Sequence, residues 1–338
     1  MIRALALITI FVNHVPGNPF EALTSKNFGF SDAAEAFVLI SGVSAGLAYG
    51  LKFRPGARLA TTLKMWRRVG VLYIAQLGTT MATLAIFSFF ALHYGAPELL
   101  EKINIGPVME DTAAALVGIV TFGHQLGYNN ILSMYGGVLL LLPALLLIGS
   151  RAGLLHMVAA SGALWLAAGL FRLGPPNFPN EGVWFLNPLS WQFLFVIGLA
   201  ATMHVKRGGK LPVHPWMVGA AAAYLIAVLP QISGLARRPA NNPLAVMGRH
   251  ALPVFVTGTI LSMVAQAWRL VHEPSIATDI AIVAAGVGAH FALAYYIEWY
   301  RGLVRGSKPV PAGPEVFVGP PLRPAHHPLP HRVKPEMA

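Results

Sequence analysis

The chain opens with MIRALALITIFVNHV (residues 1–15) and continues, after a polar loop, with AAEAFVLISGVSAGLAYG (residues 33–50). Both stretches are apolar enough to form helices in a lipid bilayer, although the first is short for a complete crossing. Within the first stretch, Arg3 and His14 are eleven positions apart. That separation places them on one face of a helix, about 16 Å apart along its axis. Ionisable side chains inside a membrane are energetically costly and by default mark a functional site.

The second stretch carries Gly42, Gly46 and Gly50, each four residues after the last. Small residues at this spacing let the backbone of another helix approach closely. We therefore expect the second helix to have a tightly packed partner. Gly78, in a later apolar run, is also predicted to be a packing site.

The composition indicates a membrane protein. Of the 338 residues, 55% are apolar and 11% are charged, and the mean hydropathy is +0.60. Soluble domains usually carry about 25% charged residues. The sequence therefore predicts an all-α, polytopic bundle of about 8–10 transmembrane helices. The candidate segments are residues 3–16, 33–51, 69–92, 131–149, 152–171, 187–205, 216–234, 251–271 and 276–297.

The net charge is +11, and its excess lies in short loops. The positive-inside rule explains that distribution better than a nucleic-acid partner does, so none is expected. The chain has no cysteine, which excludes disulfides and thiolate chemistry. It also lacks a P-loop, a dinucleotide-binding fingerprint and the HExxH motif, so neither a metal site nor a bound cofactor is predicted.

The distribution of cations predicts a topology. Six cations and no acid lie between Leu51 and Arg68, so this loop should be cytoplasmic. Residues 16–32 then form a periplasmic loop, and the apolar run 111–123 is too short to cross comfortably. If residues 216–234 cross, the basic residues after them fall on the periplasmic side. The number of crossings in that region stays open.

Two regions differ in composition. Residues 1–300 are predicted to form one transmembrane domain. Residues 301–338 are rich in proline and basic residues, which favours a disordered cytoplasmic tail.

Two parts of the opening hairpin resemble the OpgC family. They are RALALITIFVNHVPGN (residues 3–18) and NFGFSDAAEAFVLISG (residues 27–42). Weaker similarities are WRR (66–68), NPLSWQ (187–192) and GRHALPVF (248–255). The spacing of an arginine, ten residues and a histidine is also shared with the wider group of membrane acyltransferases. The similarity covers roughly residues 1–300.

The resemblance implies a multi-pass protein of the bacterial inner membrane that succinylates osmoregulated periplasmic glucans. Its expected partners are the lipid bilayer, cytoplasmic acyl-CoA (by resemblance succinyl-CoA) and a periplasmic glucan. A proton-coupled transporter of a small solute is the main alternative, and a non-catalytic scaffold is another. The oligomeric state stays open.

The hairpin brings His14, Asp32 and Glu35 to one expected depth in the membrane. A base oriented by a carboxylate is what acyl transfer to a hydroxyl needs, so these three are the candidate catalytic residues. The structural alternative for Asp32 and Glu35 is a capping box at the start of the second helix. For His14 it is a hydrogen bond to a carbonyl group.

Arg3 is a candidate contact to the acyl-CoA donor, and Lys64, Arg67 and Arg68 are candidates for binding its phosphates. Arg3 could instead pair with a lipid phosphate, and Arg67 and Arg68 could only mark topology. Trp191 and Gln192 are candidates for binding a sugar, although an interfacial aromatic belt explains them better.

Other polar residues in apolar surroundings are interpreted as structural. His290 is interpreted as a satisfied core residue. A second polar cluster is interpreted as an ordinary periplasmic loop, and it consists of His124, Gln125, Asn129, Asn130 and Tyr135.

Overall fold

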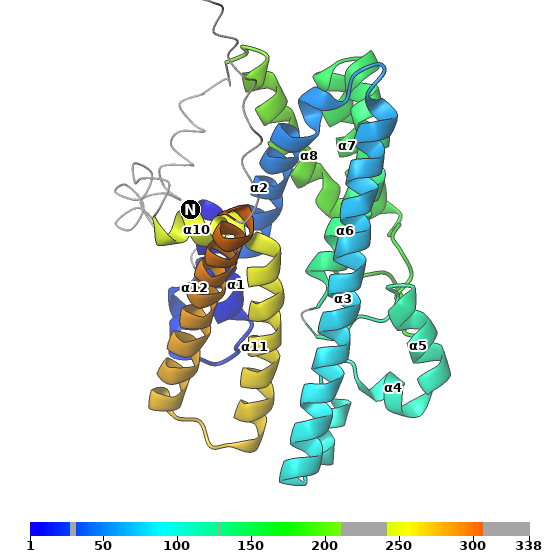
Figure 1. The fold of residues 1–338 in the computed structure, drawn as a ribbon. Coiled ribbons are helices and arrows are strands. Elements are labelled where there is room, and N and C mark those ends of the chain that lie inside the picture. Colours follow the sequence, from blue (N-terminus) through cyan, green and yellow to red (C-terminus); the bar gives the residue numbers. More distant parts are fainter. Residues whose placement is uncertain (28–31, 128, 211–241, 307–338) are drawn as a thin grey trace, which may run out of the picture. The chain divides into compact units, whose positions relative to one another are not determined.

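The computed structural model describes residues 1–27, 32–127, 129–210 and 242–306 (Figure 1). The chain divides into residues 1–298 and residues 299–338; of the second unit, residues 299–306 are described, as the end of the last helix. The predicted segment 216–234 and most of the predicted tail lie outside the described residues. The helices are α1 (Ile2–Asn13), α2 (Ala33–Ala48), α3 (Arg58–Tyr94), α4 (Gly106–Glu110), α5 (Thr112–Val120), α6 (Ile131–Arg151), α7 (Leu154–Leu170), α8 (Pro188–Lys206), α10 (Pro243–Arg249), α11 (Ala251–Val271) and α12 (Ile276–Gly306). Short 3-10 turns lie at Pro19–Leu23, Ser25–Asn27, Gly50–Lys52 and Pro97–Glu101.

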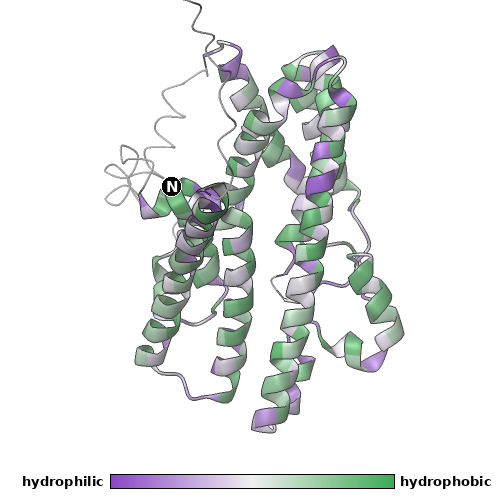
Figure 2. Cartoon of the chain, viewed as in Figure 1, coloured by the Kyte–Doolittle hydropathy of each residue, from purple (hydrophilic) through white to green (hydrophobic). Residues whose placement is uncertain are grey.

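The prediction of an all-α, polytopic membrane protein is confirmed. No strand occurs in the described residues, and six of the described helices are long and apolar enough to cross a membrane. These six include α2, α3, α6, α8, α11 and α12, while α1 and α7 are shorter apolar helices. Hydrophobic residues run along most of the length of these helices (Figure 2). The α5 helix is not among the six, in agreement with the short apolar run 111–123.

The basic segment before the third apolar run is helical, which the sequence interpretation missed. Residues 51–68 were expected to form a loop, but α3 begins at Arg58 and continues for 37 residues to Tyr94. The sequence interpretation used hydropathy, which falls where the charged residues begin. Leucine, alanine, lysine and arginine, which occur there, nevertheless all have good helix propensity. Arg67 and Arg68 therefore occupy successive positions on a continuous helix, about 100° apart around its axis.

The glycines of α2 pack against α8, as the spacing predicts. A Cβ atom on Gly42 would lie 1.9 Å from the carbonyl oxygen of Phe195, and one on Gly198 would lie 2.3 Å from that of Leu39. The two backbones therefore touch where side chains would normally separate them. The prediction for Gly78 is wrong, because a Cβ there would meet no described atom within 4 Å outside its own helix.

One hydrophobic core joins the helices that carry the candidate residues. Its members include Leu7 of α1, Phe37 of α2 and Phe195 of α8, with Met134 of α6 and Phe255 of α11. The first and second helices also contact each other directly, and α1 contacts both α10 and α11. The N-terminal end of α1 lies against Gly248 of α10, and its C-terminal end is bonded to Gln266 of α11.

The topology can be tested with a matched pair of single-cysteine variants, because the chain has no cysteine of its own. Leu23 and Leu51 are both exposed leucines, at 74% and 44%, and their replacement removes no charge. In intact cells an impermeant thiol reagent is expected to label Leu23→Cys but not Leu51→Cys, and both should react after the membrane is opened. Labelling of Leu51→Cys in intact cells would overturn the predicted orientation.

Candidate functional site

Asp32 and Glu35 form the capping box that their spacing suggested. The Asp32 side chain accepts a hydrogen bond from Ala33 N, and Glu35 Oε2 accepts one from Asp32 N at 2.7 Å. Asp32 Oδ1 also accepts a hydrogen bond from Asn13 Nδ2 at 2.9 Å. Asn13 is the last residue of α1 and precedes His14, so this bond ties the start of α2 to the end of α1 beside the histidine.

His14 is the C-cap residue that follows α1, and its position is held through its backbone. Its carbonyl oxygen accepts a hydrogen bond from Gln266 Nε2 of α11 at 2.7 Å. The His14 side chain lines a small cavity of about 10 Å³ together with Thr259, Gly258 and His290. The hydrogen bond from α11 therefore fixes the backbone from which the imidazole reaches this cavity.

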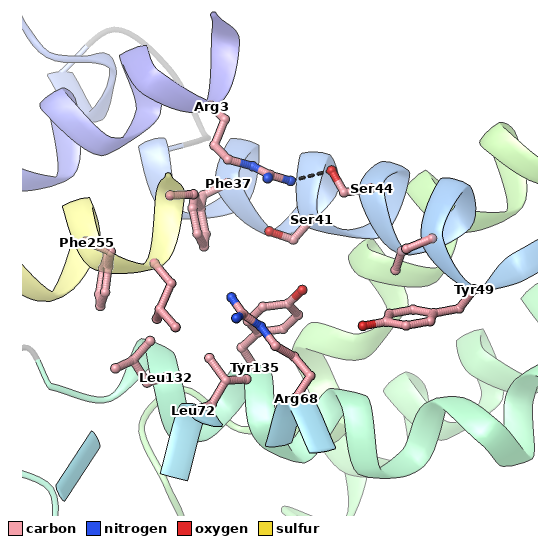
Figure 3. Close-up of a pocket in the computed structure, with 14 residues that line it drawn as sticks. Arg3, Phe37, Ser41, Ser44, Tyr49, Arg68, Leu72, Leu132, Tyr135 and Phe255 are labelled. Atoms are coloured by element: carbon pink, nitrogen blue, oxygen red, sulfur yellow. Dashed lines mark hydrogen bonds between the residues drawn. The ribbon is translucent and has the colours of Figure 1, made fainter. Parts of the chain in front are cut away.

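Arg3 lies at the opposite end of α1 and lines a larger cavity of about 130 Å³ (Figure 3). Its guanidinium donates hydrogen bonds to Ser44 Oγ and, at 3.5 Å, to the Ile40 carbonyl oxygen, both on α2. Arg3 Nε is buried and has no hydrogen-bond partner among the described residues. The Nε donor of this guanidinium is therefore still available to a group that enters the cavity.

Arg68 reaches the same cavity from α3. Figure 3 shows its guanidinium beside the Tyr135 ring, across the cavity from Arg3. Tyr49, at the end of α2, contributes a second phenol to the lining. The cavity thus combines two cations and two hydroxyl groups of tyrosine with an apolar wall, a set of groups suited to an anion attached to a less polar chain.

Phe255 of α11 separates the two cavities, and among the described lining residues it is the one that belongs to both. Its ring stacks on Phe37 of α2, with centroids 6.3 Å apart. A ligand that reached from the arginines to His14 would therefore pass these two aromatic rings.

The other candidate residues do not join either cavity. Arg67 is exposed and lines neither. Gln192 is fully buried, and its amide bonds to both the hydroxyl and the carbonyl of Ser161, so it holds α7 to α8. Trp191 is half-buried and packs on the hydrophobic core.

For two residues that line the cavities, the sequence-based interpretation differs from the position in the structure. Tyr135 was assigned to a periplasmic polar loop, but it lies on α6 and faces Arg3 and Arg68. His290 was assigned to the core, and although it is 1% exposed it shares a cavity with His14. A polar residue inside an apolar run was the available signal in both cases, yet it did not indicate which distant residue would be its neighbour.

The residues at the start of α11 form a further polar contact. His250 Nε2 lies 2.9 Å from Glu298 Oε1, and Arg249 Nε donates to the same oxygen at 3.1 Å. This contact fixes the corner between α10 and α11, from which Phe255 projects one turn later.

Comparison with protein families agrees with the resemblance seen in the hairpin. A family model described as OpgC protein matches residues 1–235 and 228–302. The chain belongs to the OpgC family. Family membership supports a general role as a membrane acyltransferase connected with osmoregulated periplasmic glucans. No match was found among curated proteins or among solved structures.

Proposed function

We propose that this OpgC-family protein is an O-acyltransferase of the bacterial inner membrane. Its donor is cytoplasmic acyl-CoA, with a succinyl group as the acyl group, and its acceptor is a hydroxyl of a periplasmic glucan. The observation that carries the proposal is the division of α1 between two cavities. Arg3 and Arg68 meet at one, and His14 lines the other.

The arginine cavity supports binding of the donor phosphates. Two guanidiniums converge there, and a charge-assisted hydrogen bond to phosphate is stronger than a neutral one. The remaining donor of Arg3 and the hydroxyls of Tyr49 and Tyr135 can supplement them. The arm of the coenzyme would then extend past Phe255 along α1, over the distance of about 16 Å between Arg3 and His14, a span that an extended pantetheine chain can cover.

The histidine cavity supports the transfer step. His14 takes the proton of the acceptor hydroxyl, whose oxygen then bonds to the acyl carbon of the thioester. When the tetrahedral intermediate collapses, the carbon–sulfur bond breaks and the coenzyme A thiolate takes the proton from His14. Asp32 and Glu35 support this step from the backbone side, because their capping interactions hold the hairpin that presents His14.

The decisive experiment uses the full chain in membrane vesicles with labelled succinyl-CoA and glucan. We expect the label to appear in the glucan, with release of free coenzyme A. The transporter alternative predicts a different result, in which an unmodified solute accumulates in the vesicles and the glucan stays unlabelled. That result would overturn the proposed acyl transfer.

Arg68 and Arg67 give a matched test of the donor site. Both carry the same charge at successive positions of α3, but only Arg68 lines the cavity. Loss of a hydrogen bond to a charged group is worth about 1.5–3 kcal/mol, so Arg68→Gln is expected to raise the KM for acyl-CoA about ten- to hundredfold. Arg67→Gln should leave it within about twofold. Equal effects of the two substitutions on this KM would contradict a donor-binding role for Arg68 and leave both arginines as markers of topology.

A further inference from the structure

His290 is a buried polar residue without an evident structural task. It lies on α12 with 1% of its surface exposed, and its Nδ1 has no hydrogen-bond partner among the described residues. Buried polar groups are nearly always hydrogen-bonded, and exceptions are often found where a ligand or a reacting group completes the bond. In a membrane protein the energetic penalty is larger still, because lipid offers no alternative hydrogen-bond partner.

The fold makes room for this imidazole. A Cβ atom on Gly258 of α11 would lie 2.4 Å from His290 Nε2, so even alanine at this position would collide with the ring. Phe11 of α1 meets the ring edge to face, with centroids 5.1 Å apart at 82°. The imidazole is therefore held between α1 and α11 in one orientation.

His290 and His14 line the same cavity, whose volume is about 10 Å³. One water molecule needs about 10–15 Å³ of such space. The cavity therefore has about the volume that one water molecule or one hydroxyl group needs. Thr259, the other polar side chain in the lining, donates its hydroxyl proton to the Phe255 carbonyl oxygen at 3.0 Å, so it is already engaged.

We propose that His290 is a second catalytic residue, which donates a ring N–H to the oxygen that becomes negative during acyl transfer. This inference rests on the proposed function. A neutral imidazole carries one N–H donor. As the acceptor oxygen bonds to the thioester carbon, the π electrons of the carbonyl move to its oxygen, and the His290 N–H stabilises that charge. The charge returns to form the carbonyl when the carbon–sulfur bond breaks, and His290 neither gains nor loses a proton.

The test compares two side chains of similar size, His290→Gln and His290→Met. Glutamine keeps an N–H donor, whereas methionine has none. Removing a donor to such an oxyanion lowers kcat by about 10²- to 10³-fold. We expect that loss in His290→Met, with the KM for succinyl-CoA within about twofold of wild type, and we expect His290→Gln to recover at least tenfold in kcat.

His156→Met serves as the matched control, because His156 is an exposed histidine on α7 that lines neither cavity. The melting temperature and monodispersity of each purified variant are measured alongside the kinetics. A folded His290→Met protein with the kcat of His156→Met would overturn the inference, as would equal losses in the methionine and glutamine variants. Both outcomes leave wild-type transfer intact. Wild-type protein that transfers no label would instead overturn the proposed function, and this inference with it.

Discussion

Replacing His14 by asparagine is expected to lower the rate of acyl transfer by about 10²- to 10⁴-fold, the usual contribution of a general base. An alcohol is a weak nucleophile at neutral pH, so removal of its proton must accompany the attack. Asparagine keeps polarity and some hydrogen bonding but cannot accept the proton. The substitution also preserves the hydrogen bond from Gln266, because that bond is made to the backbone carbonyl of residue 14.

The measurement is the transfer of label from succinyl-CoA to glucan by purified, reconstituted protein. His156→Asn provides the control, since it makes the same chemical change at an exposed position on α7. The KM for the donor should change little in His14→Asn, because the arginine cavity lies at the other end of α1. A near wild-type rate in folded His14→Asn protein would show that the proposed base is wrong, whatever family the chain belongs to.

Replacing Gly42 by alanine is expected to have the largest effect on stability. The new Cβ would lie 1.9 Å from the Phe195 carbonyl oxygen and 2.8 Å from its carbonyl carbon. Both atoms belong to the backbone of α8, so no side-chain rotation can relieve the collision, and α2 and α8 must move apart. Overpacking of a core usually destabilises by about 1–3 kcal/mol and occasionally by more. We expect a loss beyond the upper end of that range.

The measurement is the melting temperature and the monodisperse fraction of protein purified in detergent. Gly78→Ala is the matched control, because it makes the same change on a membrane helix where a Cβ meets no described atom within 4 Å outside that helix. Alanine is the better helix former, by about 1 kcal/mol, so this control should be at least as stable as wild type. Equal stability of the two variants would contradict the observed contact between α2 and α8.

The sequence alone predicted the features that depend on short stretches of chain. The apolar runs marked the membrane helices, because the length of a helix that crosses the bilayer is set by the bilayer itself. The capping box of Asp32 and Glu35 was visible because its bonds span only three residues. Arg3 and His14 could be placed at two ends of one helical face because helix geometry is regular.

The limits of α3 were missed for a related reason. Charged residues lower the hydropathy over residues 58–68, but they do not prevent a helix from forming. Hydropathy therefore does not distinguish a basic loop from a basic first part of α3. The distinction between Arg67 and Arg68 was also invisible, because it depends on which side of α3 faces the cavity.

Only the tertiary structure decided which residues meet. Tyr135 lies 132 positions from Arg3, and His290 lies 276 positions from His14, yet each pair lines one cavity. Periodicity and capping act over about four residues, and they place a side chain on a face of its own helix. Which helix covers that face follows from close packing between distant elements, such as the glycine contact of α2 with α8 and the hydrogen bond from Gln266 to His14. The sequence therefore determined the helices and placed Arg3 and His14 at the two ends of one face of α1. The packing of those helices determined the two cavities.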